Sequence, residues 1–345
     1  MRKRNSSIDF VKWVASVLVI SLHTRPFQNV SSELEFFLTQ GLARVAVPFF
    51  LTCTGFFIGK NINDYFENNT KHESIKLYLL KLSFKYFKLY FSCSLFFLFL
   101  SIPGWIKSGW FSANAFIDWM ISFFLTGSYY HLWYLISTCI AVLIIAFIFP
   151  ILKNKRYTII IMITLWLIGI IDYSYNWILP ESLRTAIVFL DKFSVLFSCV
   201  FRVLPLILVG VVISKLKIIT IKNNLIGFMI TSVLMVAELF FLFQKGVENL
   251  GYTFLTLPLA FFFFNLVYKL GRYFPENKMS TFALLAKVSM INYCIHPAII
   301  LLLDTFFTLP NWLNFVLVVI ITNIIALLYY KSRICFTRLN ERRDR

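Results

Sequence analysis

Long apolar runs recur along the whole chain, and ten of them are long enough to cross a membrane as helices. A helix needs roughly 20 apolar residues to cross a hydrocarbon core about 30 Å thick. Runs of this kind occupy residues 8–23, 41–58, 89–106, 132–151, 157–178, 193–213, 225–243, 252–268, 282–303 and 313–330. The pattern predicts an all-α, polytopic membrane helix bundle of about ten transmembrane helices, and we expect a single domain over residues 1–345.

A further apolar stretch, residues 114–126, is short, and the distribution of basic residues decides how to interpret it. If 114–126 crossed the membrane, the basic segment 153–156 would lie outside the cell, and every later basic loop would be inverted with it. If 114–126 lies on or dips into the outer face, 24 of the 33 Lys and Arg lie on the inner side and 5 on the outer side. Because cytoplasmic loops are enriched in Lys and Arg, we predict that both termini are cytoplasmic.

The composition excludes several classes of protein. Hydrophobic residues make up 59% and charged residues only 14%, whereas a soluble domain has about 25% charged residues. The net charge of +17 therefore indicates membrane topology, and we expect no nucleic-acid partner. The first apolar run lacks the cleavage site of a signal peptide. The six cysteines have neither metal-site nor redox spacing, so we expect no metal and interpret them as packing residues.

Ionisable residues inside the predicted spans are the candidates for function, because they are costly at membrane depth. The first span contains Asp9, Lys12 and His23. Lys12 and His23 are eleven residues apart, close to three turns, so they share one helix face about 16 Å apart. Two interpretations are open: this face points into the bundle, or Lys12 snorkels and His23 is an interfacial anchor. We favour the first and expect Lys12 near the inner end and His23 near the outer end.

Further polar residues are predicted at the outer end of the second and fourth spans. Arg44 begins ARVAVPFFLTCTGFF, in which Pro48 frees a backbone carbonyl and Gly55 permits close helix approach. HLWYL opens the fourth span, with His131 and Tyr134, where aromatic residues commonly anchor a helix at the interface. Arg44 is either an ordinary interfacial arginine or a group that binds an anionic or carbonyl oxygen beside a histidine.

The ninth span reads AKVSMINYCIHPAIILLLD and places His296 towards the outer leaflet, with Asp304 at the outer end. Pro297 leaves a backbone carbonyl without a partner, and His296 is expected either to bond that carbonyl or a neighbouring helix, or to serve the site. Arg202 and Glu238 are further embedded charges that can pair with each other. A group of residues is thus predicted at a similar outer depth: His23, Arg44, His131, His296 and Asp304.

The inner side carries Lys81, Lys85 and Lys88 at helical spacing in KLYLLKLSFKYFKLYF. A basic helix with interleaved aromatic residues at the cytoplasmic surface commonly binds anionic lipid. The alternative is a phosphate site for a cytosolic, nucleotide-bearing donor, which Lys12 would face from the first span.

These motifs together resemble the acyltransferase-3 family of integral membrane acyltransferases. The resemblance rests on Asp9, Lys12 and His23, on RVAVPFFLTCTGFF, on the basic entry to the third span and on YCIHP. Within the family, RVAVPFF and HLWYL are most similar to the membrane domain of the membrane-bound serine racemases of vancomycin resistance. We expect no soluble racemase domain after the last span.

The resemblance implies transfer of an acyl group, for which acetyl is expected, from cytosolic acyl-CoA to a hydroxyl of a cell-surface glycan or lipid-linked sugar. It implies that His23 is catalytic with Arg44, and that Lys12, Lys85 and Lys88 bind the donor. The family favours Arg at these three basic positions. The acyl-CoA is a co-substrate, and no bound cofactor is expected.

The resemblance also supports a different function, in which the chain is a serine-translocating membrane subunit. In that case His131, Tyr134, His296 and Asp304 would line an outer binding site, and the partner would be a separate soluble enzyme. Under either function we expect a multi-pass protein of a bacterial cell membrane, with Asp9, Pro48 and Gly55 in structural or orienting roles.

Overall fold

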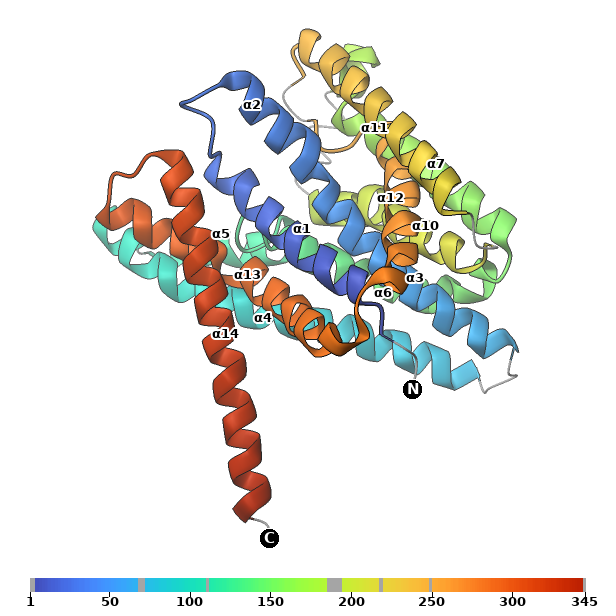
Figure 1. The fold of residues 1–345 in the computed structure, drawn as a ribbon. Helices are drawn as coiled ribbons and strands as arrows, with labels where there is room; N and C mark the ends of the chain where they lie inside the picture. The colour runs from blue at the N-terminus through green and yellow to red at the C-terminus, as the bar shows by residue number, and fades with distance from the viewer. Residues whose placement is uncertain are drawn as a thin grey trace. The chain divides into compact units, whose positions relative to one another are not determined.

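The computed structural model describes residues 4–67, 72–109, 112–184, 194–216, 220–247 and 250–343, and every regular element within these ranges is a helix (Figure 1). The predicted all-α class is therefore confirmed. By contact, the chain divides into two compact units, the first made of residues 1–47 and 267–345 and the second of residues 48–266.

Eight helices in the described ranges are long and apolar enough to cross a membrane. They occupy Ser6–Thr24, Ser32–Glu67, Ser74–Lys107, Trp133–Leu152, Ser194–Ser214, Ile221–Gln244, Glu276–Phe306 and Asn311–Ser332. Each coincides with one of the ten predicted spans, so the protein is a multi-pass membrane protein. The other two predicted spans, 157–178 and 252–268, overlap α7 (Lys155–Tyr173), a helix of 19 residues, and α12 (Thr256–Leu270), a helix of 15 residues.

The short apolar stretch 114–126 forms α5 (Ala113–Leu125), a helix of 13 residues. At 1.5 Å per residue such a helix is about 20 Å long, whereas the hydrocarbon core is about 30 Å thick. The length of α5 therefore favours the interpretation in which this segment does not cross the membrane.

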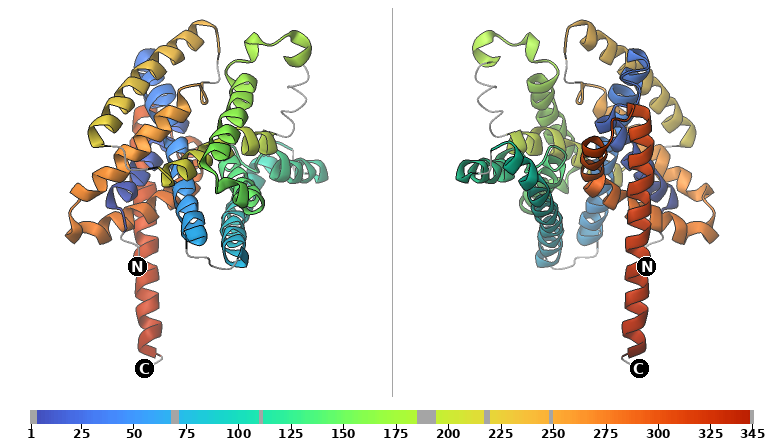
Figure 2. Two further views of the ribbon diagram at one scale, coloured as in Figure 1. Left: turned by 90° about the vertical axis from the view of Figure 1, so that its right-hand side faces the viewer. Right: turned by 90° about the vertical axis from the view of Figure 1, so that its left-hand side faces the viewer.

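The first unit is built around three long helices. Its elements are α1 (Ser6–Thr24), α2 (Ser32–Phe36), the π-helical turn η1 (Phe37–Leu42), the 3-10 turns η2 (Ala43–Val45), η6 (Gly271–Tyr273) and η7 (Glu276–Lys278), and the helices α13 (Met279–Phe306) and α14 (Asn311–Arg343). Helix α1 packs along α13, and α14 packs on both (Figures 1 and 2). The side chain of Asn311 donates to the Arg25 carbonyl at 3.0 Å, which joins the end of α1 to the start of α14, so these two helices are antiparallel.

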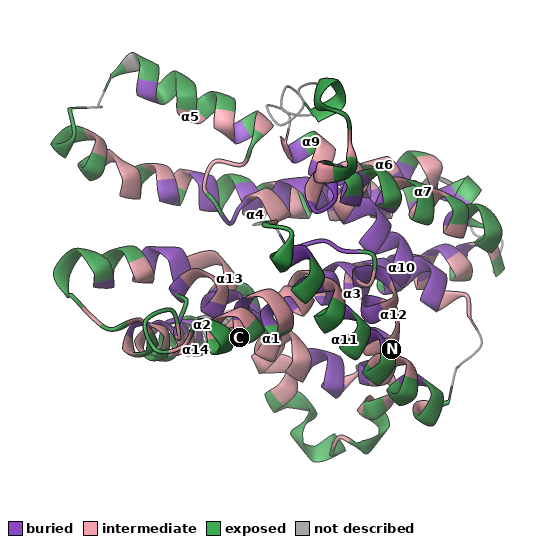
Figure 3. Ribbon diagram, turned by 90° about the horizontal axis from the view of Figure 1, so that it is seen from above, coloured by how far each residue is buried: buried purple, intermediate pink, exposed green. Residues whose placement is uncertain are grey.

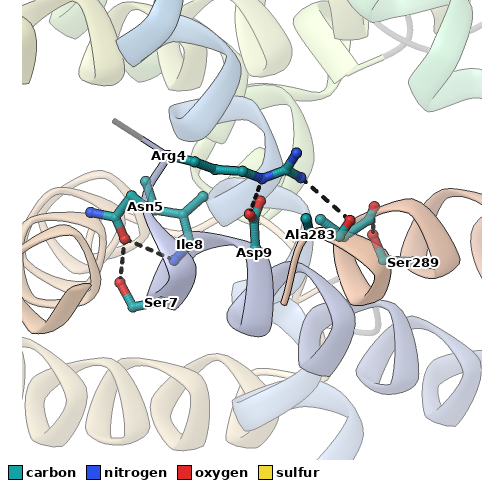
Figure 4. A network of polar contacts seen from close by, with 8 residues as sticks. Arg4, Asn5, Ser7, Ile8, Asp9, Ala283 and Ser289 are labelled. Atoms are coloured by element: carbon teal, nitrogen blue, oxygen red, sulfur yellow. Dashed lines mark hydrogen bonds and ion pairs between the residues drawn. The ribbon is translucent and has the colours of Figure 1, made fainter. Parts of the chain in front are cut away.

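The start of α1 is fixed by a group of polar contacts (Figure 4). Asn5 caps the helix, since its Oδ1 accepts hydrogen bonds from the Ile8 backbone N–H at 3.3 Å and from Ser7 Oγ at 2.6 Å. Arg4 forms an ion pair with Asp9 and donates from Nη2 to the Ala283 carbonyl of α13 at 3.4 Å. The first turns of α1 and α13 therefore lie at the same end of this unit, and the two helices run parallel.

The remaining helices lie in the second unit, except that α3 begins and α12 ends within the first unit. They are α3 (Ala46–Glu67), α4 (His72–Lys107), α5, α6 (Trp133–Leu152), α7, the 3-10 turn η3 (Asn176–Ile178), α9 (Ser194–Ser198), the π-helical turn η5 (Cys199–Val203), α10 (Leu204–Ser214), α11 (Ile221–Gln244) and α12. Helix α10 is buried along most of its length, whereas α11 is mostly exposed (Figure 3). Helix α10 therefore forms the centre of this unit's core.

Two glycines let α3 and α10 approach closely. A Cβ added to Gly55 would overlap the backbone of Ile207, and one added to Gly210 would overlap the Thr52 carbonyl. Thr52 Oγ1 donates to the Leu206 carbonyl at 3.3 Å. The prediction that Gly55 permits close helix approach is therefore confirmed.

Candidate functional site

Two of the predicted histidines lie together in the first unit. His23 is in the last turn of α1 and His296 is in α13, and their rings are stacked with centroids 5.2 Å apart and an interplanar angle of 27°. His296 is fully buried and His23 is half-buried. One face of α1 therefore presents its histidine to α13.

Pro297 determines how the His296 ring is held. Because proline has no N–H, the Tyr293 carbonyl four residues earlier loses its helical donor. His296 Nδ1 lies 2.9 Å from that carbonyl and 3.0 Å from the Asn292 carbonyl. Carbonyl oxygens only accept, so Nδ1 carries the hydrogen, and in a neutral ring Nε2 keeps its lone pair. The expected bond between His296 and the freed carbonyl is thus present.

Arg44 lies in η2, a turn that packs on α1 at a point where the helix winding changes. The chain passes from the π-helical turn η1 through the 3-10 turn η2 into α3, and Pro48 leaves the Arg44 carbonyl without its helical donor. Arg44 Nε donates to Gln40 Oε1 at 3.2 Å. Within the described residues no hydrogen bond is formed by the Arg44 Nη groups, which are therefore the donors that a ligand oxygen could use.

A second polar cluster joins α1, α13 and α14 between the two ends of the unit. Trp13 Nε1 donates to Asn323 Oδ1 at 2.8 Å. Asn292 Nδ2 lies 3.4 Å from both Asn323 Oδ1 and Ser16 Oγ. The motifs in the sequence predict no role for Asn323, although an asparagine inside an apolar span is a signal for helix association.

The expected donor residues belong to both units. Lys12 is half-buried on α1, and Asp9, one turn before it, is buried and paired with Arg4. Lys85 and Lys88 are exposed on α4 of the second unit, and Lys88 Nζ lies 4.8 Å from the centroid of the Phe84 ring. Their roles in donor binding remain a prediction.

His131 and Tyr134 belong to the second unit. His131, at 3% exposure, packs among the rings of Phe97, Tyr129 and Tyr130, with centroids 5.0, 5.8 and 5.6 Å away. Tyr134 is half-buried in the first turn of α6. Burial raises the pKa of the Tyr129 phenol, so this neighbour of His131 stays protonated at neutral pH.

Asp304 does not lie next to the stacked histidines. It is eight residues beyond His296 on α13, about 12 Å along the helix. Its side chain is exposed and accepts a hydrogen bond from Asn314 Nδ2 at 2.8 Å. Asp304 is therefore held at the α13–α14 connection.

Arg202 and Glu238 do not pair with each other, contrary to the expectation from the sequence. The Glu238 carboxylate accepts from the Tyr175 hydroxyl and from the backbone N–H groups of Phe254 and Leu255. The Arg202 guanidinium lies 4.2 Å from the centroid of the Tyr173 ring. Backbone donors satisfy the carboxylate, and an aromatic face holds the cation.

Within the described residues, no group of three His, Cys, Asp or Glu side chains is close enough to hold a metal ion. The five cysteines whose side chains are described form no disulfide with one another, and four of them are buried: Cys53, Cys93, Cys139 and Cys199.

The comparison with protein families identifies the family of this chain, because a family model described as an acyltransferase domain matches residues 5–331. The chain belongs to the acyltransferase-3 family. The match covers almost the whole chain and includes both units. The family resemblance inferred from the motifs is therefore confirmed.

Among curated proteins, this acyltransferase-family chain is similar to two from Enterococcus faecalis named amino-acid racemase. One is 29% identical over 171 residues, which are 49% of this chain and 23% of the relative. The other is 28% identical over 177 residues, which are 51% of this chain and 23% of the relative. The alignments thus cover about a quarter of each relative. No solved structure matches the chain.

Proposed function

We propose that this acyltransferase-family protein moves an acyl group, acetyl in the simplest case, from cytosolic acyl-CoA to a hydroxyl of a cell-surface glycan or lipid-linked sugar. The observation that carries the proposal is the stacking of His23 on His296, with Arg44 in the turn η2 that packs on α1. It combines a base with a cation inside a membrane protein of this family.

In the proposed reaction, His23 removes the proton from the acceptor hydroxyl, and the hydroxyl oxygen attacks the thioester carbonyl of acyl-CoA. The carbonyl oxygen becomes negatively charged in the tetrahedral intermediate, and the Arg44 Nη groups stabilise this charge. The carbon–sulfur bond then breaks, the coenzyme A thiolate takes up the proton from His23, and the acyl ester is released.

The donor phosphates are proposed to bind to Lys12, Lys85 and Lys88, which the family resemblance nominates. Lysine offers phosphate a compact charge in place of the two-pronged contact that arginine makes. His131, Tyr134, His296 and Asp304 are proposed to contact the acceptor, as residues predicted at the outer side.

The test is mass spectrometry of surface glycans in cells with and without the gene, complemented by His23→Ala. A general base contributes roughly 100- to 10,000-fold to a rate, so we expect acylated glycan to disappear in the deletion and to remain absent with His23→Ala. His72→Ala, at the first residue of α4, is the matched control and should restore acylation. Acylation restored by an equally abundant His23→Ala protein would remove His23 from the mechanism.

A second candidate function is translocation of serine, supported by the similarity to part of two proteins named amino-acid racemase. In this case the outer residues would bind the amino acid, and a soluble partner enzyme would act on it. Membrane vesicles containing the protein separate the two functions. Uptake of labelled serine without transfer from labelled acetyl-CoA would favour translocation, and transfer without uptake would favour the acyltransferase.

A further inference from the structure

The polar cluster of the first unit forms a closed ring of hydrogen bonds between three helices. Trp13 donates to Asn323, and Asn292 donates to both Asn323 and Ser16. Ser16 Oγ completes the ring by donating to the Trp13 carbonyl at 2.7 Å. Helices α1, α13 and α14 are therefore joined at one level by side chains of Trp, Ser and Asn.

The chemistry of the ring fixes the orientation of both amides. The indole N–H of Trp13 can only donate, so Asn323 must present Oδ1 to it. Asn323 Nδ2 then donates to the Val319 carbonyl of its own helix at 2.7 Å. Since Asn323 Oδ1 also faces Asn292, the latter must present its Nδ2. The ring thus sets the rotation of α13 relative to α1.

Asn292 connects this ring to the histidine pair. Its side chain is in the ring, and its backbone carbonyl accepts the hydrogen bond from His296 Nδ1 one turn later. On α1, Ser16 and His23 are seven residues apart, which is about two turns, so they lie on one face. Two contacts between α1 and α13 therefore follow each other along the same pair of faces, Ser16 with Asn292 and His23 with His296.

We infer that Asn292 is a positioning residue for the proposed acyl transfer, which holds His296 against His23 through its ring with Trp13, Ser16 and Asn323. This inference rests on the proposed function. Hydrogen bonds between transmembrane helices stabilise one helix rotation over others of similar packing. Loss of the ring lets α13 rotate, and the His23–His296 stack opens.

The experiment compares Asn292→Leu with Thr322→Val in protein reconstituted in lipid bilayers. Leu fills a similar volume without polar atoms. Thr322 is buried next to Asn323, but its hydroxyl bonds only carbonyls of its own helix, Val318 and Val319. Because small misplacements of reacting groups lower rates by up to about 100-fold, we expect Asn292→Leu to lower kcat on the order of 10- to 100-fold with KM for acyl-CoA unchanged. Thr322→Val should leave both constants unchanged.

A second readout does not depend on turnover. Diethyl pyrocarbonate modifies exposed imidazole nitrogens, and mass spectrometry measures the rate at His23. We expect this rate to rise severalfold in Asn292→Leu and not in Thr322→Val. If Asn292→Leu does not fold, Trp13→Phe keeps an aromatic side chain but removes the indole N–H that bonds Asn323, and it should give the same two changes.

Equal effects of Asn292→Leu and Thr322→Val would overturn the inference, as would wild-type kcat together with a wild-type modification rate in Asn292→Leu. If the wild-type protein transfers no acyl group, the proposed function fails. The modification rates at His23 then decide by themselves whether the ring positions the histidine pair.

Discussion

Arg44 combines an oriented guanidinium with free donor groups in a turn that packs on α1. Gln40 holds Nε, and the described residues leave both Nη groups without hydrogen bonds. Removing one oxyanion donor lowers kcat by about 100- to 1,000-fold in characterised enzymes, so we expect Arg44→Gln to lower kcat by about 100-fold or more. The measurement is steady-state transfer from labelled acetyl-CoA. Arg156→Gln, at an exposed position in the first turn of α7, should have no effect, and an equal loss in both variants would contradict this role.

Lys215 directly follows α10, and its ammonium nitrogen is buried. This nitrogen forms no hydrogen bond with any described residue. Burial lowers its pKa from 10.5 to about 8. The folded state therefore disfavours the charged form. This destabilisation is fully present below pH 8, and it disappears as the pH rises towards about 10.5, the pKa of the unfolded chain.

Lys215→Met should consequently raise the thermal unfolding midpoint in detergent at pH 7, and the gain should shrink between pH 8 and pH 10. The exposed Lys222→Met is the matched control, with no pH-dependent change expected. A gain that is the same at pH 7 and pH 10 would show that the charge of Lys215 is not the cause.

At the scale of elements, the crossing of α3 and α10 depends on glycines with no room for a side chain. Gly55→Ala would push a methyl group into the Ile207 backbone. Overpacking of this kind costs about 1–3 kcal/mol, so we expect a lower thermal unfolding midpoint.

The control is Gly104, inside α4, which has open space around it, so a Cβ added there would meet no neighbouring side chain or other helix within 4 Å. Gly104→Ala should raise the midpoint slightly, because alanine favours helix by up to about 1 kcal/mol. Equal effects at both sites would refute the close crossing.

The residues of the candidate site lie at irregular points of their helices. Pro48 and Pro297 each free one carbonyl, of Arg44 and of Tyr293. Just before Pro48 the chain changes from π-helical to 3-10 winding. At Pro297 the His296 Nδ1–H replaces the missing backbone donor to the Tyr293 carbonyl. These prolines were visible in the sequence, whereas the π-helical turn η1, which contains Gly41, was seen only in the structure.

At the scale of the whole molecule, the charge pattern predicts cytoplasmic termini. The test uses variants with one cysteine and a membrane-impermeant maleimide. A variant that keeps only Cys335, in the predicted cytoplasmic tail, should react after permeabilisation and not in intact cells. A variant with Ser108→Cys, directly after α4 on the predicted outer side, should react in intact cells. The reverse result would mean that the chain crosses the membrane with inverted orientation.

The sequence by itself determined the membrane class, the positions of the spans and the family. Apolar runs about 20 residues long form helices in lipid, because a helix pairs its own backbone N–H and C=O groups in hydrogen bonds. The motifs around His23, Arg44 and His296 were sufficient for the family because they are local in sequence. The same reasoning identified most polar residues at membrane depth, since any such residue is conspicuous among Phe, Leu and Ile.

Only the tertiary structure decided which of these residues meet. In the structure, the His23 ring stacks on the His296 ring. Asp304 lies farther along α13 and is bonded to Asn314. Glu238 accepts a hydrogen bond from the Tyr175 hydroxyl and does not pair with Arg202. The structure also revealed the role of Asn323, whose partners are 310 and 31 residues away in sequence. The reason is geometric: helical periodicity fixes the face of each residue on its own helix, but the rotation and partner of that helix arise from packing between segments far apart in the chain.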